Sequence, residues 1–205
     1  MKKTVQRSIQ ILFLALFVVL AINGKIQIWM GIFVLSALAS LVFSRFYCGW
    51  LCPIHTVLKP VTWAKKKLHI QSFNIPSFLK KTWVRIFMLV LFLGILAFSL
   101  KTGKKLPVLP ISVALGFVLT LFFPEELWHS HLCPYGTILS LPSRKAKYRM
   151  DIEQEKCISC GKCKKVCPTV AITKEEKKFS ITKNECLVCR ACAEACPTGA
   201  ITYHS

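Results

Sequence analysis

Eight of the eleven cysteines in the sequence stand in two runs near its carboxy end. The first run, residues 157–168, has the spacing Cys-x2-Cys-x2-Cys-x3-Cys-Pro, and residues 186–197 repeat it. This spacing is typical of bacterial proteins that bind two [4Fe–4S] clusters. Zinc sites instead use separated Cys-x2-Cys pairs, and disulfides persist only in oxidising compartments. The spacing therefore predicts a two-cluster iron–sulfur domain in a reducing compartment.

The same spacing assigns each thiol to a cluster, because the fourth cysteine of each run ligates the other cluster. The expected ligands of the first cluster are Cys157, Cys160, Cys163 and Cys196. The expected ligands of the second cluster are Cys186, Cys189, Cys192 and Cys167. The repeat extends beyond the cysteines, since residues 168–172 resemble residues 197–201 at an offset of 29. We therefore expect two similar halves related by a pseudo-dyad.

The three remaining cysteines belong to a second repeated pattern. Residues 48–53 contain Cys-x3-Cys-Pro, and residues 129–134 contain His-x3-Cys-Pro at an offset of 81. If these segments are helical, the two ligand-type side chains of each motif share a helix face. Three thiolates and one imidazole suit zinc or an iron–sulfur centre, whereas free cysteines are often simply packed in a core. The pattern thus suggests a third site with the ligands Cys48, Cys52, Cys133 and His129.

Four apolar runs must position these motifs. They lie at about 9–22, 26–46, 83–100 and 106–123. Their lengths are close to the roughly 20 residues that cross a bilayer as a helix. Turn residues at 23–24 and at 101–105 join the runs into two hairpins. An amphipathic segment at 57–68 follows the first hairpin and is expected to lie on the membrane surface.

The composition supports a membrane protein, since 54% of the residues are apolar and the mean hydropathy is +0.50. The expected fold class is membrane α-helical, with four transmembrane helices in two repeated hairpins followed by an α+β bacterial 2[4Fe–4S] ferredoxin domain. We place the four-helix domain at residues 1–140, a basic linker at 141–150 and the ferredoxin domain at 151–205.

Charge predicts the orientation in the membrane. Residues 1–150 carry 19 of the 28 basic residues and two of the nine acidic ones. These basic residues flank apolar runs, which favours contact with anionic lipid and excludes a nucleic-acid partner. One predicted side carries Lys2, Lys3, Arg7, Arg45, Lys59, Lys65, Lys66, Lys67, Lys80, Lys81, Arg144, Lys145, Lys147 and Arg149. The other carries Lys25, Lys101, Lys104 and Lys105. We therefore expect a multi-pass protein of the inner (cell) membrane, with both termini and the ferredoxin domain in the cytoplasm.

The segment Phe-Tyr-Cys-Gly-Trp-Leu-Cys-Pro at residues 46–53 resembles the membrane-bound polyferredoxin family. That family includes NapH-type quinol dehydrogenase subunits, NosR-type proteins and CcoG-type oxidase-assembly proteins. The resemblance covers nearly the whole chain, and the first membrane-side motif and both cluster runs match position by position. His129 departs from the pattern, because it replaces the first cysteine of the second membrane-side motif. By architecture the chain is most similar to the NapH type.

The resemblance implies electron transfer between the quinone pool and a protein redox partner, or companion subunits of a respiratory complex, through two [4Fe–4S] clusters. The alternatives are a CcoG-like metal-ion reductase or assembly factor for a respiratory oxidase, and a redox-sensing membrane regulator. A bound quinone would need proton acceptors, and Glu126 and His129 are the expected candidates. Further titratable side chains at a similar depth are Tyr47, His55, Glu125 and His131.

Overall fold

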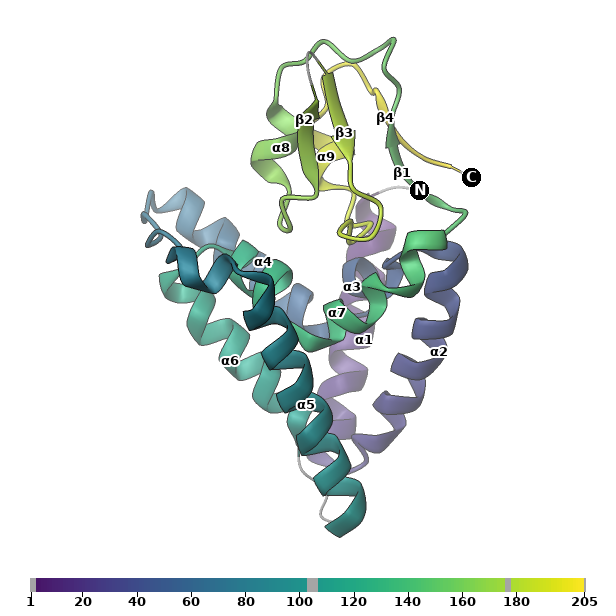
Figure 1. Ribbon diagram of the computed structural model, residues 1–205, viewed down its shortest axis with the longest axis vertical. Helices are drawn as coiled ribbons and strands as arrows, with labels where there is room; N and C mark the ends of the chain where they lie inside the picture. Colours follow the sequence, from purple (N-terminus) through teal and green to yellow (C-terminus); the bar gives the residue numbers. More distant parts are fainter. Residues whose placement is uncertain (1–2, 103–106, 176–177, 205) are drawn as a thin grey trace. The chain divides into compact units, whose positions relative to one another are not determined.

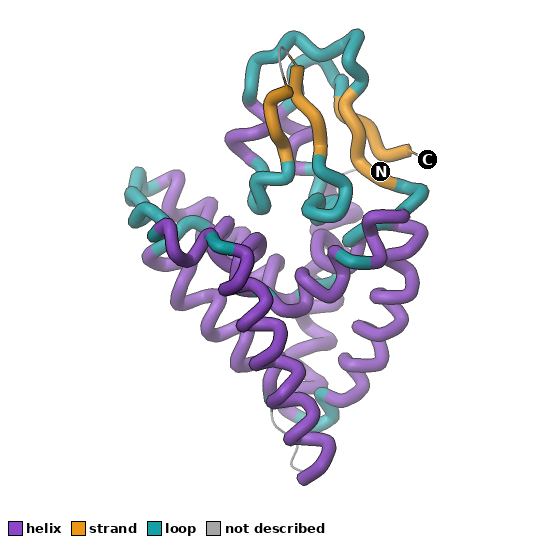
Figure 2. The backbone as a smooth tube through the Cα atoms, in the orientation of Figure 1, coloured by secondary structure: helices purple, strands orange, loops and turns teal. Residues whose placement is uncertain are grey.

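The computed structural model of the chain describes residues 3–102, 107–175 and 178–204. Long helices form the amino-terminal part, and short helices and strands form the carboxy-terminal part (Figures 1 and 2). The chain divides into two compact units. The first unit comprises Met1–Ile32 and Leu51–Thr137, and the second comprises Phe33–Trp50 and Ile138–Ser205. The second unit therefore joins the carboxy-terminal domain to the segment that carries Cys48.

The four expected apolar runs are helical. They form α1 (Lys3–Ile22), α2 (Gln27–Phe43), α5 (Thr82–Thr102) and α6 (Val108–Phe122). Within α1 and α5, the segments Thr4–Ile22 and Thr82–Ser99 are long and apolar enough to cross a membrane. Helices α2 and α6 have 17 and 15 residues, and at about 1.5 Å per residue they are shorter than a hydrocarbon core of about 30 Å. Length and composition thus support two crossing helices, and the four-span arrangement stays a prediction.

The expected turn at residues 23–24 closes the first hairpin. Gly24 has a φ of +65°, a left-handed conformation that glycine adopts without steric cost. The backbone N–H of Lys25 donates to the carbonyl of Leu20 at 2.9 Å, which terminates α1. Beyond the turn, Trp29 packs edge-on against Phe17 at a centroid distance of 5.3 Å. The expected second turn, at 101–105, lies partly outside the described residues.

Helix α2 ends earlier than the apolar pattern predicts. The pattern runs to residue 46, but Ser44 has a φ of 60° and interrupts the helix. A separate short helix, α3 (Phe46–Trp50), follows and contains Cys48. The left-handed residue turns the chain at this point. The first membrane-side motif therefore lies outside α2.

Helix α4 (Pro53–Lys67) forms the scaffold of the first unit and packs against α1 and α6. It begins at a proline, which has a preset φ suited to the first helical position. Lys65 is buried in α4 and donates through Nζ to the carbonyls of Thr120 at 2.9 Å and Phe123 at 3.2 Å. A cation is favourable there because the last carbonyls of α6 lack intrahelical partners. This contact fixes the last turn of α4 relative to the end of α6.

The chain after α6 passes through a π-helical segment, η2 (Leu127–Leu132), into α7 (Pro134–Ser140). The backbone N–H of Cys133 donates to the carbonyl of Trp128, five residues back, at 2.8 Å. The Trp128 indole lies on Gly116, where an added Cβ would approach it to 3.1 Å. Short π-helical segments often occur at functional sites. Here the wider turn carries His129.

The carboxy-terminal part consists of two antiparallel strand pairs and two short helices. Strand β1 (Arg149–Ile152) pairs with β4 (Ile201–His204), and β2 (Ile172–Glu175) pairs with β3 (Lys178–Ile181). The other elements are η3 (Pro142–Lys145), α8 (Lys162–Val166) and α9 (Ala191–Ala195), with η1 (Ser77–Lys80) in the first unit. The domain core is built from Met150, Ile152, Ile172, Phe179, Val188 and Ile201. Strand β1 begins at Arg149, inside the segment expected to be a linker.

Candidate iron–sulfur and metal sites

The structure groups the eight carboxy-terminal thiols around two cavities. One cavity is lined by Cys157, Cys160, Cys163 and Cys196, together with apolar side chains of the core. The other is lined by Cys167, Cys186, Cys189 and Cys192. Each cavity thus receives three cysteines from one run and the fourth from the other, which is the grouping that the spacing predicts.

The two cysteine loops share an unusual backbone conformation. Positive φ values occur at Ser159 and Gly161 in the first loop and at Val188 and Arg190 in the second, 29 residues later in each case. A positive φ is strained for a β-branched residue such as Val188. Such a conformation turns successive N–H groups inward, and the N–H of Val188 donates to the Cys186 sulfur at 3.4 Å. The loops are therefore shaped to surround a negatively charged sulfur centre.

The thiols themselves fit an iron–sulfur cluster. Burial raises the pKa of Cys186 to about 11, and burial together with neighbouring thiolates raises the pKa of Cys192 further. Burial also acts on Cys196, but hydrogen bonds from Thr198 and neighbouring backbone N–H groups outweigh it and lower the pKa. Four convergent thiolates in such a place need a bound cation, because metal binding is what keeps buried cysteines deprotonated. The donor set of four thiolates is that of a [4Fe–4S] cluster.

The loop of the second cavity is packed against the segment that follows α2. Arg45 is 1% exposed, and its Nη1 donates to the carbonyls of Asn184 and Glu185 and to the Glu185 carboxylate at 3.3–3.4 Å. Trp50 donates through Nε1 to the carbonyl of Val188 at 3.1 Å. A Cβ added at Gly49 would lie 2.3 Å from the Leu187 carbonyl oxygen.

The strands are also fixed to the end of α2. The backbone N–H of Tyr148 donates to the carbonyl of Val42 at 2.8 Å, and the Tyr203 hydroxyl donates to that of Phe43 at 3.3 Å. The Tyr148 ring stacks on both Phe43 and Tyr203. The ferredoxin-like part is therefore held to the end of α2 by one backbone hydrogen bond, one side-chain hydrogen bond and ring stacking.

Comparison with known proteins agrees with this geometry. The model of a "4Fe-4S dicluster domain" matches residues 150–203. The model of a "4Fe-4S binding domain" matches residues 26–71, 84–105 and 106–151, together more than half of the chain. The chain belongs to the membrane-bound polyferredoxin family. Its thiol donors and its family make this polyferredoxin an iron–sulfur electron-transfer protein.

Three relatives illustrate the similarity. The ferredoxin-type protein NapH of Escherichia coli is 25% identical over 67% of this polyferredoxin and 52% of its own length. The methylamine utilization ferredoxin-type protein MauN of Methylorubrum extorquens is 28% identical over 62% of this chain and 48% of its own. The regulatory protein NosR of Pseudomonas aeruginosa is 25% identical over 67% of this chain and 22% of its own. The polyferredoxin spans about half the length of most of the curated relatives that it matches.

The expected third site of the polyferredoxin is divided between the two units. Cys48 belongs to the second unit, where burial raises its pKa and the adjacent Arg45 partly offsets this effect. Cys52 and Cys133 are buried in the first unit, and the Cys133 sulfur accepts from the N–H of Gly136 at 3.4 Å. His129 belongs to the first unit as well. A centre that uses all four residues stays a prediction.

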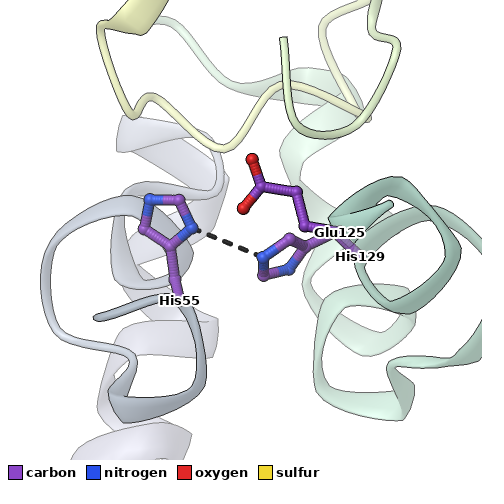
Figure 3. A group of neighbouring side chains, drawn as sticks. All are labelled: His55, Glu125 and His129. Atoms are coloured by element: carbon purple, nitrogen blue, oxygen red, sulfur yellow. Dashed lines mark hydrogen bonds between the residues drawn. The ribbon is translucent and has the colours of Figure 1, made fainter. Parts of the chain in front are cut away.

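The structure also gathers three side chains that the sequence does not bring together. His55 lies in the first turn of α4, Glu125 lies between α6 and η2, and His129 lies in η2 (Figure 3). His55 Nδ1 and His129 Nε2 are 3.4 Å apart, and one ligand atom from each of the three residues lies within 4.8 Å of the others. Glu125 belongs to this group. Glu126, which the sequence analysis expects to accept protons from a quinone, is the residue before η2 and is not in the group. The spacing Glu125-x3-His129 is a weak sequence signal for the pair.

Arg45 gives a testable electrostatic effect at the second cavity. We expect Arg45→Gln to lower the reduction potential of the second cluster by about tens of millivolts, because a buried positive charge favours the reduced, more negative cluster. Potentiometric titration followed by EPR measures the shift. Arg45→Lys is the matched control, because it keeps the charge and should leave the potential nearer to that of the unmodified protein. Equal potentials in all three proteins would show that Arg45 acts only as a packing group.

Proposed function

We propose that the protein is a membrane-anchored electron carrier that passes electrons between the quinone pool and a protein redox partner through two [4Fe–4S] clusters. The ligands would be the eight cysteines that surround the two cavities. The observation that carries the proposal is the contact between the second cysteine loop and the segment after α2. Arg45 and Trp50 bind the carbonyls of residues 184–188, so the second cluster would lie beside the apolar helix.

This contact suggests an order of electron transfer. The second cluster would exchange electrons with the membrane, and the first cluster would exchange them with the partner. Cys160 of the first cavity is exposed, whereas Cys189, the equivalent residue of the second cavity, is half-buried. An exposed cluster edge suits contact with another protein, and a packed one suits a fixed donor. The names of the relatives agree with such a role, since another relative, from Escherichia coli, is called a putative electron transport protein.

Oxidation of a quinol also releases protons, and we propose Glu126 and His129 as the groups that accept them. Both lie just after α6, in the segment that leads to Cys133. Each side chain has an atom that can accept a proton, an imidazole nitrogen in His129 and a carboxylate oxygen in Glu126. Both termini and the ferredoxin domain would face the cytoplasm of a four-span protein in the inner membrane, as the distribution of lysine and arginine predicts.

Quinol-driven reduction of the clusters tests the proposed function. In membrane vesicles that contain the protein, we expect an added quinol to reduce the clusters on the timescale of quinol turnover. EPR measures the reduction. Glu126→Gln should slow this reduction about 100-fold or more, within the range for loss of a general base, without changing reduction by dithionite. Clusters that dithionite reduces and that no quinol reduces would overturn the quinone link.

A metal-handling function is favoured by a different observation, namely the buried thiols Cys52 and Cys133 in the unit that also holds His55 and His129. A metal-ion reductase should oxidise its reduced clusters when an oxidised metal ion is added, because the cluster electrons pass to the metal. An electron carrier should show quinol-driven reduction that is insensitive to added metal. The same vesicle experiment, repeated with and without the metal, separates the two functions.

A further inference from the structure

We propose that His55, Glu125 and His129 form a binding site for one divalent transition-metal ion, separate from the iron–sulfur clusters. The site goes beyond the proposed electron transfer, which needs none of these residues as a metal ligand. Its ligand set is two imidazoles and one carboxylate, the combination that proteins use for zinc and for mononuclear iron. Figure 3 shows the three side chains converging from α4 and from the chain after α6.

The first argument is distance. Two nitrogens bound at about 2.0–2.1 Å to one tetrahedral ion are about 3.3–3.4 Å apart. His55 Nδ1 and His129 Nε2 are 3.4 Å apart, which is long for a direct hydrogen bond between nitrogens. A ligand atom of Glu125 lies within 4.8 Å of both, so a small rotation of the carboxylate completes three ligands. The separation of the two nitrogens therefore fits an ion bound between the rings.

The second argument is burial without partners. His55 is 3% exposed and His129 is 6% exposed. Within the described residues, Oε2 of Glu125 is buried and has no hydrogen-bond partner. Buried polar atoms are almost always paired, so such atoms call for a bound water or ion. A cation bound between the three side chains would give the unpaired carboxylate oxygen of Glu125 a partner.

The surrounding structure holds the three ligands in place. Helix α4, which carries His55, packs along α6, which precedes Glu125, and Lys65 in the last turn of α4 donates to the last carbonyls of α6. The π-helical turn sets His129, because a wider turn changes which side chain faces α4. Since three protein ligands leave a fourth position open, the ion can accept a water or another small ligand. With the metal on Nε2 of His129, the proposed proton transfer would rest on Glu126.

Zinc is the appropriate probe, because it is redox-inert and binds nitrogen and oxygen ligands more tightly than divalent manganese, iron or cobalt. The protein is purified anaerobically with its clusters and titrated with zinc against a competing chelator. We expect one zinc ion per chain, with nitrogen and oxygen neighbours in zinc-edge X-ray absorption spectra. His55→Gln, Glu125→Gln and His129→Gln should each weaken zinc binding about tenfold or more.

Glu126→Gln and His131→Gln are the matched controls, since they change neighbouring side chains outside the three ligands and should bind zinc normally. Unchanged iron and sulfide contents in every variant show that the cluster domain is intact, and an unchanged far-UV circular dichroism spectrum shows that the helices around the site are intact. The proposal is overturned if the protein binds no zinc, if the ligand variants bind it as tightly as the controls, or if the spectra show sulfur neighbours. Glu126→Gln also separates the two proposals, because it should slow quinol oxidation and leave zinc binding unchanged.

Discussion

Substitution of Cys192 by alanine is expected to remove the second cluster and to reduce the iron content from about eight to about four atoms per chain. Cys192 is buried in the domain core, and its sulfur lines the second cavity with Cys167, Cys186 and Cys189. A cluster held by three thiolates has an open iron that water attacks. Burial raises the pKa of Cys186, so without the metal this thiol would regain its proton. Iron and acid-labile sulfide analysis measures the change.

The same variant tests the grouping of the thiols. Two nearby clusters give an interacting EPR signal in the reduced protein, and Cys192→Ala should leave the simple signal of a single cluster. Glu194→Gln, on the exposed side of the same helix α9, is the control and should keep both clusters. An unchanged iron content in Cys192→Ala would contradict the assignment of the second cavity. A colourless unmodified protein after anaerobic reconstitution would contradict both assignments.

We expect Gly49→Ala to lower the melting temperature of the protein by about 5 °C or more, which is the second of the two largest effects predicted. The added Cβ would lie 2.3 Å from the Leu187 carbonyl oxygen and 3.0 Å from the backbone of Val188 and Cys189. These are backbone atoms, so the clash cannot be relieved by rotating a side chain. Overpacking of this kind costs about 1–3 kcal/mol, and here it would also displace the loop that carries Cys186 and Cys189.

Gly31→Ala provides the matched control, because Gly31 lies in α2 and an added Cβ there meets no atom within 4 Å. Alanine is the better helix former, so this variant should melt at or above the temperature of the unmodified protein. We expect Gly49→Ala to change the EPR signal of the second cluster as well, since its loop must shift. A normal melting temperature for Gly49→Ala would show that the cysteine loop does not rest on α3.

Together these two variants separate the formation of the clusters from their placement. Cys192→Ala removes a donor, whereas Gly49→Ala keeps every donor and disturbs the surface on which the loop rests. If electrons enter through the second cluster, Gly49→Ala should slow quinol-driven reduction while dithionite still reduces both clusters. That outcome would link the contact of residues 45–50 with residues 183–188 to function.

The sequence by itself determined the features that depend on neighbours in the chain. The cysteine spacing predicted which thiols share a cavity, because a tight loop places every third residue on its inner side and the repeat supplies the fourth donor. The apolar runs predicted the positions of the four long helices, and residues 23–24 predicted the first turn, since glycine adopts the left-handed conformation at no steric cost. Each of these signals depends only on residues that are neighbours in the chain, so a short sequence pattern is sufficient to predict the structure there.

Only the tertiary structure decided the contacts between distant residues. Arg45 and Glu185 are 140 positions apart, and His55 and His129 are 74 apart. Packing of α4 on α6 brought Glu125 to His55 and His129, whereas its neighbour Glu126 is not in that group. Ser44 ended α2 before the apolar pattern ends. Such contacts form only when helices and loops pack against one another. The residues of each packing surface come from distant parts of the sequence, so no single short segment predicts the contact.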